Sequence, residues 1–184
     1  MRAQPARLAA ALVHLSRTPA PETSQLAPLQ VDVISLEPFT LVATRNTGDD
    51  SQMAVAYESL FGWAAEHGVL ERVAGIYGVP WQDRRDTPAA ECEFDCALAF
   101  DGEVTAGDGT QPLVLGGGQW ARVRHVGAYA GLEPATDMLL AHWLPGSGHM
   151  LREVPLFHHY LDDPEQTPEA LLRTDIHLPV LRLS

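Results

Sequence analysis

The spacing of hydrophobic positions changes several times after residue 30, and each change marks a new element. Residues 31–45 are rich in apolar and β-branched side chains and are interrupted at Glu37-Pro38, which predicts two short strands or one bulged strand. Residues 51–68 carry apolar side chains at helical spacing and end in a glycine, which predicts a helix. After a loop predicted at 78–87, residues 91–100 alternate between apolar and acidic side chains, as expected for a strand with one buried face.

The second half of the chain repeats this order of elements. After a glycine-rich stretch at 101–118, expected to be a flexible connector, the patterns for strand, helix, strand and strand return at 119–125, 131–143, 156–160 and 171–180.

Short motifs recur with the elements. Arg45-Asn-Thr-Gly matches Arg124-His-Val-Gly, Ile76-Tyr matches Leu156-Phe, and two Thr-Pro pairs are each followed eight residues later by an aspartate, Asp95 or Asp175. Such self-similarity indicates a duplicated supersecondary unit. The sequence therefore predicts an α+β fold, a tandem pseudo-symmetric duplication of a β-α-β-β unit whose antiparallel sheets carry the helices on one side and leave a groove between the halves.

The expected organisation is one domain with a short extension. Residues 1–30 are predicted to form an N-terminal helix, at 7–16, and a proline-containing linker. The domain then spans 31–184, with repeats at about 31–102 and 112–183.

The charge of the chain excludes several chemistries. Its 12 basic residues are all arginines, so it has no lysine for a Schiff base or a phosphate-binding loop. Residues 1–30 hold three arginines and one glutamate, so the net charge of −12 for the whole chain becomes −14 for the rest. Because this charge repels phosphate backbones, no direct nucleic-acid binding is expected.

Other residue types narrow the class of protein further. Cys92 and Cys96 lie too far apart in one strand for an unstrained disulfide and are expected to act as small hydrophobic residues. No apolar run reaches the roughly 20 residues of a membrane helix, and the N-terminus lacks a secretory signal, so a cytoplasmic protein without membrane contact is predicted. The eight histidines do not show a metal-site spacing, and neither metal nor cofactor is expected.

Four segments resemble one known family. They are Arg124-His-Val-Gly-Ala-Tyr, Trp143-Leu-Pro-Gly-Ser-Gly, Phe157-His-His-Tyr-Leu-Asp-Asp-Pro and residues 167–180. Through them the chain from about Val31 to Leu181 resembles the GyrI-like family, the effector-binding module of AraC- and MerR-type regulators and of stand-alone DNA gyrase inhibitors.

The resemblance implies a groove that binds hydrophobic, often cationic, small molecules, commonly with a central acidic residue. In the family this residue usually follows the phenylalanine that corresponds to Phe157, and here His158 takes its place. The histidine does not guarantee a preference for cations. Asp175, on the last strand, is the candidate that supplies the acidic group instead.

The candidate ligand-binding residues are aromatic, imidazole and carboxylate side chains expected near this groove. They are His158, Tyr160, Asp175, His177, Trp120, Trp81 and Tyr57. Structural roles stay open for several of them, because strand histidines can be hydrogen-bonded at an edge, Asp175 and Asp95 can brace strands, and Tyr57 can fill the core. No catalytic residue is predicted.

Three functions are compatible with these residues. The first is a stand-alone sensor or sequestering protein for amphipathic, including cationic, small molecules. The second is a hydrolase that detoxifies reactive small molecules in the same groove, with His158 and Asp175 or Tyr160 activating water. The third is a protein-interaction role, such as inhibition of DNA gyrase or partnership with a transcription regulator.

Overall fold

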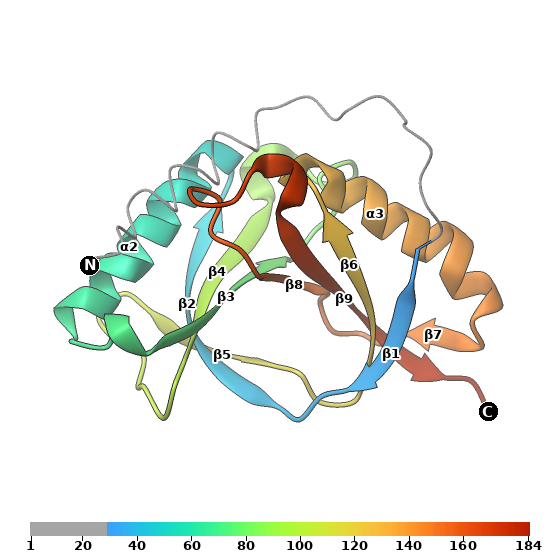
Figure 1. Cartoon of the computed structure of the whole chain (residues 1–184), viewed down its shortest axis with the longest axis horizontal. Coiled ribbons are helices and arrows are strands. Elements are labelled where there is room, and N and C mark those ends of the chain that lie inside the picture. The colour runs from blue at the N-terminus through green and yellow to red at the C-terminus, as the bar shows by residue number, and fades with distance from the viewer. Residues whose placement is uncertain (1–28) are drawn as a thin grey trace.

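The computed structural model describes residues 29–184, so the helix predicted at 7–16 lies outside the described residues. Residues 29–184 form two α-helices and one nine-stranded antiparallel sheet (Figure 1). The strands are β1 (Val31–Ser35), β2 (Phe39–Thr47), β3 (Val73–Pro80), β4 (Glu93–Phe100), β5 (Gln111–Leu115), β6 (Gln119–Val126), β7 (His149–Leu151), β8 (Phe157–Tyr160) and β9 (Arg173–Arg182). The α-helices are α2 (Met53–Glu66) and α3 (Leu132–Met138), and a π-helical turn (Leu139–Trp143) extends the second.

The order of strands confirms the predicted duplication. Along the sheet the order is β1-β6-β9-β8-β3-β4-β2-β5, and the ninth strand, β7, pairs with β9 outside this order. The two halves are therefore related by a pseudo-twofold axis between β8 and β3. The first strand of each repeat is exchanged: β1 pairs with β6 of the second repeat, and β5 pairs with β2 of the first. The exchange ties the repeats together at both ends of the sheet.

Matching side-chain contacts show how closely the repeats agree. Arg45 Nε donates to Asp95 Oδ1 at 2.8 Å and its Nη2 donates to Oδ2 at 3.0 Å. Arg124 and Asp175 form the same two bonds at the same two distances. The motifs that recur in the sequence are therefore equivalent positions of one duplicated unit.

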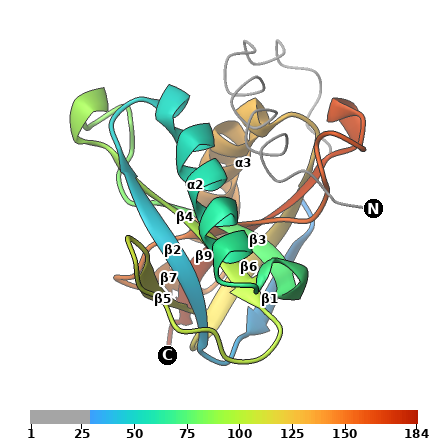
Figure 2. The ribbon, with the colours of Figure 1, turned by 90° about the vertical axis from the view of Figure 1, so that its left-hand side faces the viewer.

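The sheet is covered on both faces. One face packs against α2 and α3, and each helix has its own buried cluster, centred on residues such as Leu60 and Leu139. The opposite face holds a third cluster that includes Trp120 and Phe157. The sheet is strongly bent, as Figures 1 and 2 show. The segments after β1 and β5 meet where Leu36 N donates to Gly118 O at 3.0 Å.

This bend overturns the prediction that the strand at 91–100 has one buried face. In β4 both faces are buried, because Cys96 and Leu98 pack under α2 while Asp95 and Ala97 face the third cluster, and all four are 0% exposed. The acidic residue on the second face tolerates burial because Arg45 binds it. The alternation of polar and apolar residues in β4 therefore did not distinguish a solvent-exposed face from a buried one.

Two further differences concern the segments expected to be loops. The predicted loop at 78–87 is wrong at its start, since β3 continues to Pro80. The glycine-rich stretch at 101–118 is more than a connector, because it contains β5 with Pro112 inside it. β5 is an edge strand, where a proline without an amide hydrogen is tolerated. The two strands on either side of Glu37-Pro38 and the helix ending before Gly68 are as predicted.

Among residues 29–184, no helix combines the length and the apolar character that crossing a membrane requires.

Candidate ligand-binding site

A cavity of about 580 Å³ lies on the helix side of the sheet, between α3 and the loop that follows β3. Its size is typical of sites for small organic molecules. Its floor is formed by Phe94, His158 and Tyr160, and its wall by Tyr129 and Leu140. Its mouth carries charged side chains: Asp83, Arg84, Arg85, Glu133 and Asp137.

His158 is a buried polar group at the floor of the cavity. The residue is 8% exposed, and its ring forms no hydrogen bond to the part of the chain that the structure describes, with Nδ1 fully buried. Burial lowers the pKa of His158 to about 4, assisted by the neighbouring His177 and His125. His158 is therefore neutral near pH 7, and the floor of the cavity carries a buried imidazole that has no hydrogen-bond partner among the described residues.

A glycine keeps the space beside His158 open. Gly78 on β3 pairs directly with His158 on β8. A Cβ atom at Gly78 would lie 2.5 Å from Phe94 Cζ and 2.8 Å from Tyr160 Oη, both of which belong to side chains of the floor. The floor rings can approach this closely only because the position carries no side chain.

Aromatic rings form much of the inner surface. Tyr129 and Tyr160 make an edge-to-face pair with ring centroids 5.3 Å apart, and His158 and Tyr160 are 6.1 Å apart at a similar angle. Such rings offer flat faces to apolar or cationic groups.

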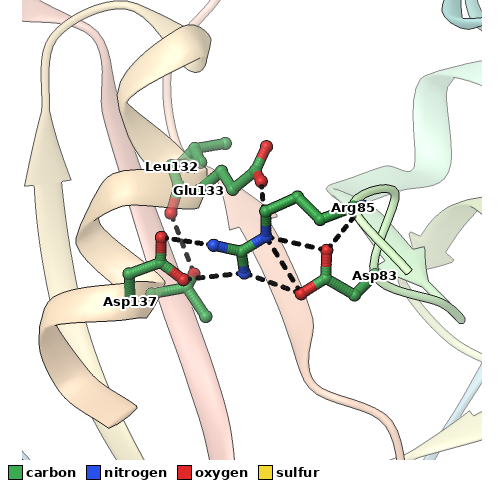
Figure 3. A network of polar contacts seen from close by, with 6 residues as sticks. Asp83, Arg85, Leu132, Glu133 and Asp137 are labelled. Atoms are coloured by element: carbon green, nitrogen blue, oxygen red, sulfur yellow. Dashed lines mark hydrogen bonds and ion pairs between the residues drawn. The ribbon is translucent and has the colours of Figure 1, made fainter. Parts of the chain in front are cut away.

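The mouth is bridged by the guanidinium of Arg85 (Figure 3). Arg85 Nη1 and Nη2 donate to the two carboxylate oxygens of Asp137 at 2.9 Å each, which joins the loop of the first repeat to α3 of the second. The same guanidinium is bound by Asp83 of its own loop, and its Nε lies 3.3 Å from Glu133. These bonds lower the pKa of Asp83 to about 2 and raise that of Arg85.

Three of the seven predicted residues line this cavity: His158, Tyr160 and Trp81. Trp81 is 37% exposed, and its Nε1 donates to Asp95 at 2.9 Å while Arg45 lies 5.0 Å above its ring. One edge of the indole is thus engaged in the strand-bracing contact of the first repeat.

Asp175 and His177 lie on the opposite face of the sheet from the cavity. In the pairing of β8 with β9, Asp175 is opposite His159 and His177 is opposite Phe157, whereas His158 is opposite Ile176. Paired residues share a face, so the four side chains predicted on these two strands do not all face this cavity. The period of a strand fixes which residues share a face, but it does not say which face of the sheet carries the cavity.

Asp175 has a structural partner in this position. It is 4% exposed and bound by both donors of Arg124. Burial acts to raise the pKa of Asp175, but the bonds from Arg124 outweigh it and hold that pKa below its ordinary value. His177 stacks on Phe157 with ring centroids 4.3 Å apart, and burial lowers its pKa to about 4.

Trp120 and Tyr57 are core residues. Trp120 is 2% exposed and belongs to the third cluster, where its Nε1 donates to Gly117 O at 3.0 Å. Tyr57, on α2, is fully buried and donates to Tyr77 O at 2.7 Å. Neither residue lines the cavity.

Several residues of the site were not singled out in the sequence. They are Phe94, Tyr129, Arg85, Glu133 and Asp137. Tyr129 stands in one of the motifs that resemble the family, and Arg85 occupies a position where the second repeat has Glu165, which is a signal that a comparison of the repeats could have used. No group of three potential metal ligands occurs among residues 29–184.

The fold and the cavity define a duplicated α+β domain with a cavity of ligand size beside the strands where its repeats meet. The sequence profile of the GyrI-like small molecule binding domain matches residues 29–181. The chain belongs to this family.

Two relatives and two solved structures give the context. The probable transcriptional regulator YgiV of Escherichia coli K12 is 31% identical over 120 residues, which cover 64% of this chain and 75% of YgiV. A DNA gyrase inhibitor of Erwinia billingiae is 29% identical over 129 residues, covering 67% and 79% of the two chains.

The C-terminal domain of EcmrR superposes with a TM-score of 0.69 at 15% identity, covering 85% of this chain and all of that one. A hydrolase from Listeria innocua superposes with a TM-score of 0.59 at 14% identity, covering 83% and 92% of the two chains. At these identities the structures show that the fold is shared.

Proposed function

We propose that this protein binds amphipathic small molecules, cationic ones among them, in the cavity over His158 and acts as a sensor or sequestering protein. The observation that carries the proposal is the unpartnered, neutral imidazole of His158 at the floor of a cavity lined by aromatic rings. A buried polar group without a partner is costly unless something binds it. The family membership of the chain supports a small molecule as that partner.

The binding test is a thermal-shift and calorimetric titration with three aromatic probes that differ in charge. These are tetraphenylphosphonium, triphenylphosphine oxide and tetraphenylborate. We expect the melting temperature to rise with at least one probe, because a ligand that binds only the folded state at 100 times its Kd stabilises it by about 2.7 kcal/mol.

A cavity-filling variant gives the control. Thr136 lines the cavity, so Thr136→Trp places an indole in that space and should abolish the shift. Ala65→Trp, at an exposed position of α2 that does not line the cavity, should leave it intact. If none of the three probes binds, or if both variants bind like the wild type, the proposal fails.

The geometry supports the hydrolase alternative less well. Among the described residues His158 has no carboxylate partner to orient it, because Asp175 lies on the other face and is bound by Arg124. A histidine whose pKa is about 4 is also a weak base at neutral pH.

The protein-interaction role and the cytoplasmic location stay predictions. The similarity to a DNA gyrase inhibitor supports the first of these, and inhibition of gyrase supercoiling by the purified protein is its test.

A further inference from the structure

Arg85 breaks the symmetry of the cavity mouth. The loops of the two repeats have the same backbone bonds, since Thr87 N donates to Asp83 O and Thr167 N donates to Asp163 O, both at 3.0 Å. In the second repeat a glutamate, Glu165, stands where the first has Arg85. The loop therefore folds without an arginine at this position, and the role of Arg85 must be sought in what its guanidinium touches.

The guanidinium lies among carboxylates that border the cavity. Glu133 and Asp137 are four residues apart on α3, so their side chains share one face of the helix, and they are 56% and 42% exposed. Together with Asp83 they outnumber the two arginines of the mouth. The described residues of the mouth thus keep excess negative charge even with Arg85 bound.

The floor of the same cavity supplies an independent indication of a ligand. His158 is more than nine-tenths buried and lines the cavity, and its ring has no hydrogen bond to residues 29–184. An occupant that reaches from this ring to the mouth would contact the imidazole at one end and the carboxylates at the other.

We propose that Glu133 and Asp137 form the subsite for the positively charged group of an amphipathic ligand, and that Arg85 fills this subsite while the cavity is empty. The inference rests on the proposed function and names the ligand class of the same site. On binding, the cationic group of the ligand replaces the guanidinium at Asp137. Arg85 keeps its bonds to Asp83, which belongs to the same loop and moves with it.

The experiment compares the affinities of a cationic and a neutral probe, tetraphenylphosphonium and triphenylphosphine oxide, by calorimetry at fixed salt. Arg85→Gln should tighten binding of the cation about two- to fivefold. The gain is modest because the exposed ion pair of Arg85 with the carboxylates competes only weakly with the ligand. Binding of the neutral probe should not change. Glu133→Gln combined with Asp137→Asn should remove the preference for the cation, with or without Arg85→Gln.

Arg84→Gln is the matched control, because it removes the same charge from the neighbouring residue of the same loop. Equal tightening by Arg84→Gln and Arg85→Gln would trace the effect to net charge and overturn the inference. If Arg85→Gln binds both probes more weakly than the wild type does, Arg85 shapes the cavity, and this result would also overturn the inference.

The two proposals fail in different ways. A wild-type protein that binds the neutral probe and shows no preference for the cation overturns the subsite and leaves the proposed function standing. A wild-type protein that binds neither probe, nor an anionic one, overturns both.

Discussion

His158 on β8 lies directly opposite Gly78 on β3, where the two repeats meet. The repeat alignment that matches Ile76-Tyr with Leu156-Phe makes these two residues counterparts of each other. One of these equivalent positions carries an imidazole and the other carries no side chain, so the pseudo-symmetry of the fold is broken where the repeats meet. The cavity lies over this position.

Gly78→Ala should therefore impair ligand binding and stability together. The new methyl group would lie within 2.8 Å of Phe94 Cζ and Tyr160 Oη, so these two rings of the cavity floor must shift. Overpacking of this kind costs about 1–3 kcal/mol, which urea denaturation measures. Gly62→Ala on α2, where a Cβ meets nothing within 4 Å, should instead stabilise the protein by roughly 0.5–1 kcal/mol. A Gly78→Ala protein with wild-type stability and affinity would contradict the assignment of the floor.

Asp175→Asn should weaken the fold without changing ligand selectivity. The substitution removes the charge that binds Arg124 and lies on the face opposite the cavity. Loss of a charge-assisted pair of hydrogen bonds should cost about 1–3 kcal/mol in urea denaturation. Asp95→Asn is the matched variant in the first repeat and should cost at least as much, because Asp95 also accepts from Trp81. A loss of cation preference in Asp175→Asn alone would restore Asp175 as the acidic determinant.

The free energy of unfolding should fall as the pH drops from about 6.5 to about 4. The folded protein keeps His158 and His177 unprotonated down to about pH 4, whereas the unfolded chain protonates them near their ordinary pKa of about 6.5. The unfolded state binds more protons in this range, so each histidine contributes a slope of about 1.4 kcal/mol per pH unit, and the full stability is present above pH 6.5.

Urea denaturation across this pH range tests the linkage. His158→Gln and His177→Gln should each make the slope shallower. His67→Gln is the control, because bonds to Trp63 O and Asp108 raise the pKa of the exposed His67 and give its contribution the opposite sign. A free energy that stays constant between pH 6.5 and 4 would contradict the buried, neutral state of both histidines.

The two cysteines should be unreactive until the protein unfolds. Cys92 and Cys96 are free thiols that are 4% and 0% exposed, and burial raises the pKa of Cys96 strongly. Because the thiolate is the reactive form, Ellman's reagent should label both residues in urea and neither in the native protein. Rapid native labelling of Cys96 would show that α2 opens away from β4.

The sequence determined most of the fold. Apolar spacing located α2, the break at Glu37-Pro38 and most strands, because the periods of helices and strands are local properties of the chain. The repeated Arg and Asp motifs predicted the duplication, and the structure places them as the equivalent pairs Arg45–Asp95 and Arg124–Asp175. β5 was not predicted, because an edge strand restricts the choice of its residues only weakly.

Only the tertiary structure decided the site. The period of two along β8 and β9 fixed that His158 shares a face with Tyr160, and Asp175 with His177, but the register between the strands and the side covered by the helices decided which pair faces the cavity. The contact of Arg85 with α3 joins residues 52 positions apart, which no local pattern encodes. Local periodicity sets the orientation of side chains within an element, whereas a binding site depends on how distant elements pack against one another.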